Sequence, residues 1–168
     1  PGVGDAVPAK WYPAKGAPVL IVDPAGCDTA LKSEAFRSAR ASGHAVLCID
    51  AFQTGAAKTE RPKLPKFYLT FNRSDDQNRV QDILTALAFL KEKSSSTAEI
   101  SASGRAGLWA VFAAAVAPVP VRLHADTDGF HGTDNEYLSE FFVPGIQRAG
   151  GIATASILLE TRGAGKNP

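Results

Sequence analysis

The stretch Ala98-Glu-Ile-Ser-Ala-Ser-Gly-Arg-Ala-Gly-Leu-Trp-Ala110 decides the fold of this chain. It opens with a short segment that predicts a strand over residues 98–102, and then passes through a run of small residues. An alanine-rich segment follows at once and predicts a helix over residues 108–116. This helix is apolar all round, which indicates that it is buried. The stretch is therefore a strand, a tight turn and a helix in direct succession.

Outward from this stretch, strands and helices alternate along the chain. Apolar runs predict further strands, amphipathic segments predict helices, and Ser74 with Gln77 forms a capping box before one of them. The further strands are expected over 18–23, 45–50 and 119–125, and the further helices over 29–42, from 75 to near 91, and over 135–142. A polar loop with prolines, residues 51–70, separates the second strand from its helix. Such alternation predicts an α/β fold, a mostly parallel sheet with helices on both faces.

Length and charge define the class of protein. The 168 residues suit a single domain over 1–168, with 1–17 as an N-terminal arm or edge strand and 152–168 as a weakly structured tail. The formal net charge of +1 gives no argument for nucleic acid as a partner. No apolar run reaches the roughly 20 residues of a membrane span. The first residue is a proline, so we expect a processed piece of a longer protein, and a secreted or periplasmic parent stays open.

The chain contains two cysteines, Cys27 after one predicted strand and Cys48 inside the next. Free cysteines pack as small hydrophobic residues, and buried free thiols are the favoured interpretation here, with a disulfide as the alternative. No pair or cluster of cysteines and histidines has the spacing of a structural zinc site.

Four segments together resemble the α/β-hydrolase superfamily, and within it the branch of acetyl xylan esterases and dienelactone hydrolases. They are residues 19–26, 42–55, 71–82 and 98–110, and the resemblance spans about residues 18–160. It implies a three-layer sandwich, here truncated because the chain stops where the last two strands of the family would begin. It also implies a carboxylic-ester hydrolase with backbone amides of 23–26 in an oxyanion hole and a serine at the turn after the strand.

The residues at that turn depart from the family pattern. In the G-x-S-x-G motif that presents the catalytic serine, Ala102, Gly104 and Ala106 stand at the glycine, serine and glycine positions. Gly104 has no side chain, so it cannot attack a carbonyl group. Ser103 is a weaker candidate nucleophile, because Arg105 would then crowd a position that needs a small residue.

The other members of a catalytic triad also lack their usual places. The resemblance puts an acid and a histidine on loops after later strands, and the only histidines after Gly104 are His124 and His131. The remaining triad candidates are His131 and Asp126, together with Ser103. Asp126, Asp128 and His131 are also candidate metal ligands, but a solvated loop that caps the next helix is the favoured interpretation.

Structural roles are favoured for the remaining polar residues. A charge network at one helix end is expected to tie that helix to its neighbouring loops, and its members are Arg73, Asp75, Asp76, Arg79 and Asp82. We expect His44 to be a surface or capping residue and Asp50 to accept hydrogen bonds from loop amides. Trp109 and Phe112 are expected in the core.

Three hypotheses for the function follow. The first is a non-catalytic α/β-hydrolase-like domain that serves as a binding or structural module. The second is an active carboxylic-ester hydrolase, acting on sugar esters or lactones, that uses Ser103 or groups outside the chain. The third is a subunit of a larger assembly, because a sheet that ends early exposes an edge that another chain or domain would cover. No cofactor is predicted.

Overall fold

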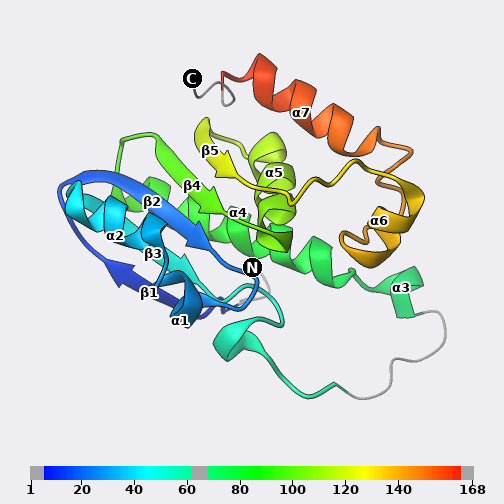
Figure 1. The fold of residues 1–168 in the computed structure, drawn as a ribbon, viewed down its shortest axis with the longest axis horizontal. Coiled ribbons are helices and arrows are strands. Elements are labelled where there is room, and N and C mark those ends of the chain that lie inside the picture. Colours follow the sequence, from blue (N-terminus) through cyan, green and yellow to red (C-terminus); the bar gives the residue numbers. More distant parts are fainter. Residues whose placement is uncertain (1–5, 62–67, 164–168) are drawn as a thin grey trace.

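A single five-stranded sheet forms the centre of the computed structural model, which describes residues 6–61 and 68–163. The strand order is β1-β3-β2-β4-β5 (Figure 1). The first strand runs antiparallel to β3, and all other neighbours are parallel. The strands are β1 (Ala9–Tyr12), β2 (Gly16–Val22), β3 (His44–Ile49), β4 (Ala98–Ala102) and β5 (Val121–Ala125). The predicted α/β fold with a mostly parallel sheet is confirmed, and β1 is the edge strand that was one of the two alternatives for residues 1–17.

Helices pack on both faces of this sheet, as predicted. Helices α1 (Cys27–Ala30) and α2 (Glu34–Ala41) cover β2 and β3 on one face, and α4 (Asp75–Lys93) and α5 (Arg105–Val116) cover the other. The connections also hold the short helices η1 (Gly55–Ala57), α3 (Tyr68–Phe71) and α6 (Asp134–Ser139), and α7 (Gly151–Thr161) packs against α5. Residues 62–67 of the predicted loop lie outside the described residues.

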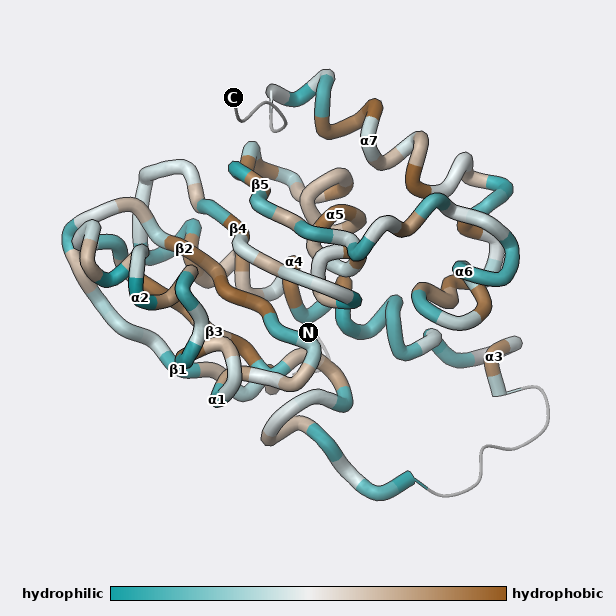
Figure 2. The backbone as a smooth tube through the Cα atoms, in the orientation of Figure 1, coloured by the Kyte–Doolittle hydropathy of each residue, from teal (hydrophilic) through white to brown (hydrophobic). Residues whose placement is uncertain are grey.

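The two faces of the sheet have cores of different size. The larger core lies under α4 and α5, where Leu20, Ile100 and Trp109 are almost completely buried. The smaller core lies under α1 and α2 and is built on Val19 and Val46. Strand β2 contributes to both cores, and accordingly it is hydrophobic along much of its length (Figure 2). A continuous apolar run is the expected pattern for such a doubly buried strand.

On the face that carries α1 and α2, strands β4 and β5 present polar side chains. Along β4 and β5 apolar residues, which are buried except for the half-buried Leu123 and Ala125, alternate with polar residues that are half-buried or exposed. The polar side chains are Glu99 and Ser101 on β4 and Arg122 and His124 on β5, and a cavity of about 230 Å³ lies between part of this set and α2. Alternation of this kind is typical of a sheet face in contact with water.

Local capping sets where the helices begin. At Ser74 the predicted capping box is present, with hydrogen bonds between Ser74 and Gln77 in both directions. The single helix predicted over 29–42 is wrong, because the chain breaks after α1 and Ser33 caps α2 by accepting a hydrogen bond from Phe36 N at 3.2 Å. A serine side chain competes with the helical backbone for hydrogen bonds and therefore favours such a start.

The expectation of free thiols is also wrong. Cys27 and Cys48 form a disulfide, with their Cα atoms 5.4 Å apart, and both residues are buried. It connects the start of α1 to the C-terminal end of β3. Cys27 begins the helix after β2, and Cys48 lies in β3, the parallel neighbour of β2, so their proximity is a property of the tertiary fold.

The C-terminal region is helical where a weakly structured tail was predicted. Helix α7 places Ala155 and Leu159 against the core, and Tyr137 Oη accepts a hydrogen bond from Ile152 N at 2.7 Å. Residues 164–168 of the predicted tail lie outside the described residues. Within residues 6–61 and 68–163, no helix combines the length and apolar character needed to cross a membrane.

Candidate functional site

The turn between β4 and α5 has the geometry of a nucleophile elbow. Gly104 sits at its tip with φ of 57° and ψ of −139°, a conformation that side chains disfavour and glycine accepts. Such a sharp strand-to-helix turn is the one that presents the serine of G-x-S-x-G. Gly104 is the residue of this turn with a positive φ, and neither Ser103 nor Arg105 has one.

The neighbours of Gly104 serve the helix and a nearby loop. The Ser103 carbonyl oxygen accepts hydrogen bonds from Ala106 N at 3.2 Å and Gly107 N at 3.3 Å, which starts α5. The Arg105 guanidinium donates to the Glu140 carbonyl oxygen at 2.8 and 3.1 Å, just after α6. The Ser103 side chain is exposed, and in the described part of the chain no hydrogen bond joins it to an imidazole or a carboxylate.

The loop after β2, which the family resemblance assigns to an oxyanion hole, has its amides occupied. Ala25 N donates to Asp23 Oδ1 at 2.7 Å, and Gly26 N donates to the Asp23 carbonyl oxygen at 3.0 Å. Pro24 has no N–H group. Asp50 Oδ1 accepts a hydrogen bond from Cys27 N at 2.7 Å, which is the structural role expected of Asp50. The loop geometry is therefore maintained by its own hydrogen bonds.

The loop after β5 brings one acidic residue to the elbow. A Cβ atom built on Gly104 would lie 3.2 Å from Asp128 Oδ2, so the carboxylate flanks the space of the missing side chain. Asp128 has a positive φ of 50°, and its backbone N–H donates to Asp126 Oδ1 at 3.0 Å. From the sequence, Asp128 was predicted only as a candidate metal ligand. The spacing of residues along the chain did not indicate that it lies close to Gly104.

The rest of this loop forms hydrogen bonds at the start of α6. His131 N donates to Glu136 Oε1 at 3.2 Å, and Thr133 with Glu136 forms a capping box at the start of α6. Hydrogen bonds from Thr133 N and the Thr133 hydroxyl hold the pKa of the Glu136 carboxyl below its usual value. Among the described residues, no group of three histidine, cysteine or acidic side chains is placed to hold a metal ion. The loop thus caps the following helix.

Part of the predicted charge network of α4 is present, around Asp75, Asp76 and Arg79, whereas Arg73 forms no ion pair or hydrogen bond with the described residues. Asp76 is buried and accepts hydrogen bonds from Arg79 Nη1 at 2.8 Å, Trp109 Nε1 at 2.9 Å and Phe142 N at 2.7 Å. Arg79 also donates to the Phe52 carbonyl oxygen at 3.0 Å and lies over the Trp109 ring. One carboxylate therefore ties α4 to α5 and to the segment that follows α6.

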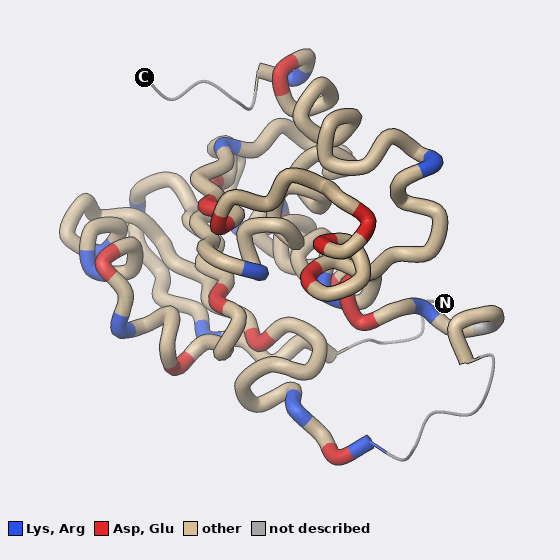
Figure 3. Tube along the Cα trace, turned by 45° about the vertical axis from the view of Figure 1, so that its right-hand side comes forward, with Lys and Arg blue, Asp and Glu red and all other residues tan. Residues whose placement is uncertain are grey.

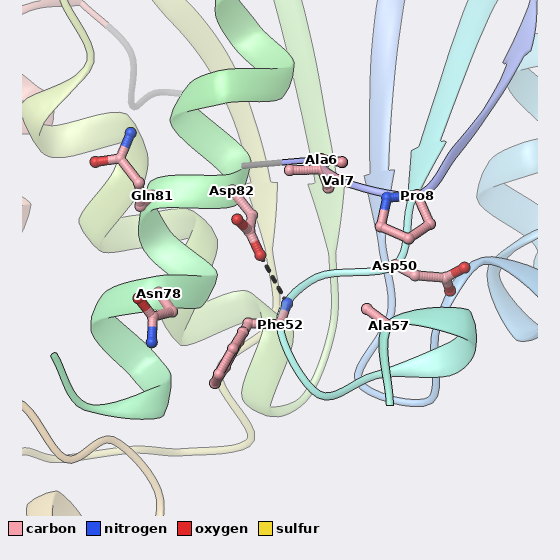
Figure 4. Close-up of a pocket in the computed structure, with 9 residues that line it drawn as sticks. All are labelled: Ala6, Val7, Pro8, Asp50, Phe52, Ala57, Asn78, Gln81 and Asp82. Carbon is pink, nitrogen blue, oxygen red and sulfur yellow. Dashed lines mark hydrogen bonds between the residues drawn. The ribbon is translucent and has the colours of Figure 1, made fainter. Parts of the chain in front are cut away.

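A cavity of about 320 Å³ lies on the other side of α4, away from the elbow (Figure 4). Its polar wall comes from α4 and the segment after β3, and its lining residues are Ala6, Val7, Pro8, Asp50, Phe52, Ala57, Asn78, Gln81 and Asp82. Asp82 Oδ2 accepts a hydrogen bond from Phe52 N at 2.7 Å, and Figure 4 shows the Asp50 carboxylate turned away from Asp82. Asp50 and Asp82 therefore both accept hydrogen bonds from backbone N–H groups. Outside this cavity, the Nδ1 atom of His44 lies 2.9 Å from the Ala17 carbonyl oxygen.

Among known proteins, similarity to this chain is found in solved structures. The structure of Rv0554 from Mycobacterium tuberculosis superposes with a TM-score of 0.54 and 14% identity, covering 96% of this chain and 64% of that one. MGS-M2, an alpha/beta hydrolase enzyme from a deep-sea metagenome library, gives a TM-score of 0.50 and 15% identity over 70% of this chain and 39% of that one. The fold is that of the α/β-hydrolases.

A third structure agrees with this fold. BpoC from Mycobacterium tuberculosis H37Rv, described as a candidate non-heme bromoperoxidase, gives a TM-score of 0.52 and 16% identity over 71% of this chain. The chain spans about two fifths of the length of BpoC and MGS-M2, 40% and 39% respectively. No protein-family model and no curated protein sequence matches the chain.

Proposed function

We propose that this chain is a non-catalytic α/β-hydrolase-like module, related to the acetyl xylan esterase and dienelactone hydrolase branch, that acts as a binding or structural unit. The observation that carries the proposal is Gly104 at the tip of the elbow, where the fold presents its nucleophile. A serine-based relay needs a nucleophile within hydrogen-bond reach of its base. Without a side chain at Gly104 there is no group for a base to activate.

The surroundings of the elbow support the same conclusion. Carbonyl chemistry requires amide donors aimed at the developing oxyanion, and the amides of Ala25 and Gly26 donate to Asp23 instead. The Asp128 carboxylate beside Gly104 would also repel negative charge that develops there.

The competing proposal is an active carboxylic-ester hydrolase that uses Ser103. The exposure of Ser103 directly beside the elbow tip is the observation in its favour. Against it, the positive φ typical of a residue that presents a nucleophile belongs to Gly104, and Arg105 donates to the Glu140 carbonyl oxygen.

A chromogenic acetate-ester assay separates the two proposals. We expect the purified chain to release p-nitrophenol from p-nitrophenyl acetate no faster than an equal concentration of a Ser103→Ala variant. The matched control is Ser101→Ala, which removes a hydroxyl from β4 outside the turn. Turnover that Ser103→Ala abolishes and Ser101→Ala retains would overturn the non-catalytic proposal and establish the hydrolase.

The disulfide is an argument for an oxidising compartment. Disulfides such as Cys27–Cys48 persist in oxidising environments and are uncommon in the reducing cytosol. We therefore propose an oxidising compartment, secreted or periplasmic, for this protein. A thiol count on protein isolated under alkylating conditions from the native source tests this, because two free thiols would contradict it.

A further inference from the structure

A groove of about 310 Å³ lies between α4, α5 and the segment after α6. Its lining residues are Arg73, Gln77, Val80, Gln81, Phe112, Val116, Phe141, Val143 and Ile146. Contacts within the chain fix its shape, because Asp76 on α4 accepts hydrogen bonds from Trp109 on α5 and from Phe142 N in the third wall. Ligand pockets in proteins measure roughly 300–1,000 Å³, so this groove suits a small molecule.

One side of the groove is apolar. The Phe112 and Phe141 rings stack with their centroids 4.3 Å apart and their planes 11° apart. Val116 beside them is 56% exposed, whereas Val80 on α4 is half-buried. An apolar group seated here would remove this aliphatic surface from water, which is favourable.

The other side of the groove offers hydrogen-bond donors. Gln77 and Gln81 lie one turn apart on α4, and Arg73 precedes the cap residue Ser74. Gln77 Oε1 already accepts a hydrogen bond from Ser74 N at 2.8 Å, which leaves the Gln77 side-chain NH₂ group as a donor. Figure 4 shows the Gln81 side chain turned away from Asp82, which lines the other cavity of α4. Arginine has donors only, so a ligand at this side must supply acceptors.

The charge beside the groove is positive. Asp75 is paired with Arg61 at 2.9 Å, and Asp76 is paired with Arg79 at 2.8 Å. Arg73 has no such partner in the described part of the chain. Basic and acidic residues are mixed along the rest of the chain (Figure 3), so this local pairing decides which cation is available. A guanidinium group binds a carboxylate through two parallel hydrogen bonds.

We propose that this groove binds a small carboxylic acid with an aromatic or branched apolar body. The carboxylate accepts hydrogen bonds from Arg73 and from the Gln77 side-chain NH₂ group, and the apolar body lies against Phe112 and Val116. The proposal goes beyond the function given above, because the groove does not involve the elbow at Gly104.

The direct test is an NMR titration of the backbone amides with phenylpropionate. We expect saturable shifts confined to residues 77–81, 112–116 and 141–146, with a dissociation constant below about 5 mM for so small a ligand. The neutral amide of the same acid and acetate should each bind at least about fivefold more weakly, because one lacks the charge and the other lacks the apolar body. Weaker binding of phenylpropionate, an amide that binds within about fivefold of it, or shifts centred elsewhere would overturn the proposal.

Variants identify the charge that acts. Arg73→Gln should weaken phenylpropionate at least about fivefold and leave the binding of the neutral amide unchanged. Its matched control is Arg37→Gln, which removes the same charge from an exposed position of α2 on the other face of the sheet and should bind as the native chain does. Val116→Glu places a negative charge at the exposed apolar wall and should also weaken the acid. The dispersion of the amide signals shows that each variant is folded, and an unfolded Arg73→Gln leaves Val116→Glu as the deciding variant.

Two results with these variants contradict the site. If Arg37→Gln weakens phenylpropionate as much as Arg73→Gln does, the attraction is one of overall charge. If Arg73→Gln weakens the neutral amide as much as the acid, the arginine supports the wall and does not bind the carboxylate. The titration contains no ester, so its failure leaves the assignment of Gly104 intact, whereas ester turnover would refute that assignment without affecting the titration.

Discussion

Breaking the disulfide should cost a large part of the stability of this domain. Cys27 and Cys48 are 21 residues apart, so the bridge closes a loop of about 22 residues. Restricting a loop of this length in the unfolded chain is worth about 3 kcal/mol in the chain-entropy model. Domains of this size have a free energy of unfolding of about 5–15 kcal/mol, so the loss would be substantial.

Urea unfolding measures this effect, with and without the reductant TCEP. With a dependence of about 2 kcal/mol per molar urea, loss of the bridge should lower the midpoint by about 1.5 M. The variant Cys27→Ala/Cys48→Ala should unfold near the reduced protein, and TCEP should leave its midpoint unchanged. The disulfide would be refuted if TCEP left the urea midpoint of the native chain unchanged and the unfolded protein had two reactive thiols without reductant.

Three further predictions test the scaffold. Asp76→Asn should lower the free energy of unfolding by about 2–4 kcal/mol, because the mostly buried guanidinium of Arg79 loses its buried carboxylate partner. An unchanged midpoint of urea unfolding would contradict this role of Asp76. Gly107→Ala, normally favourable in a helix, should destabilise by about 2 kcal/mol or more in thermal unfolding, because its Cβ would lie 1.9 Å from the Asp126 carbonyl oxygen. Glu136 has a folded pKa below its ordinary 4.5, so the α6 cap should be stable above that pH and weaken as pH falls through the lower folded pKa. NMR of the Thr133 amide should follow this transition, and Glu136→Gln should abolish it.

The sequence predicted the parts of the fold that local pattern determines. Apolar runs located β2 and β3, and the capping box at Ser74 located α4. Two errors came from tertiary contacts. The pairing of Cys27 with Cys48 depends on which strands become neighbours, and α7 is a helix in part because it packs on α5. Neither contact leaves a periodic trace in the local sequence.

At the candidate site the sequence identified the turn and could not identify its surroundings. The strand, small residues and helix around Gly104 were sufficient to place the elbow. Asp128 reaches Gly104 because β5 lies beside β4, and Arg105 reaches Glu140 across the segment after α6. Such approaches between separate loops follow from strand order, which the spacing of single residues does not encode.

The shape of the elbow is weak support for activity in this chain, because glycine adopts its positive φ without backbone strain. A side chain held at φ of 57° and ψ of −139° is strained by roughly 1–3 kcal/mol, and such strain persists only where the surrounding structure imposes it. Gly104 adopts the same angles without a Cβ atom and without this strain, so the turn needs no role beyond joining β4 to α5. The following helix turn packs closely, because Gly107 lies against the Asp126 backbone and so joins the start of α5 to the segment after β5. The part of the fold that presents a nucleophile in an enzyme is therefore retained in the proposed non-catalytic module as a packing element.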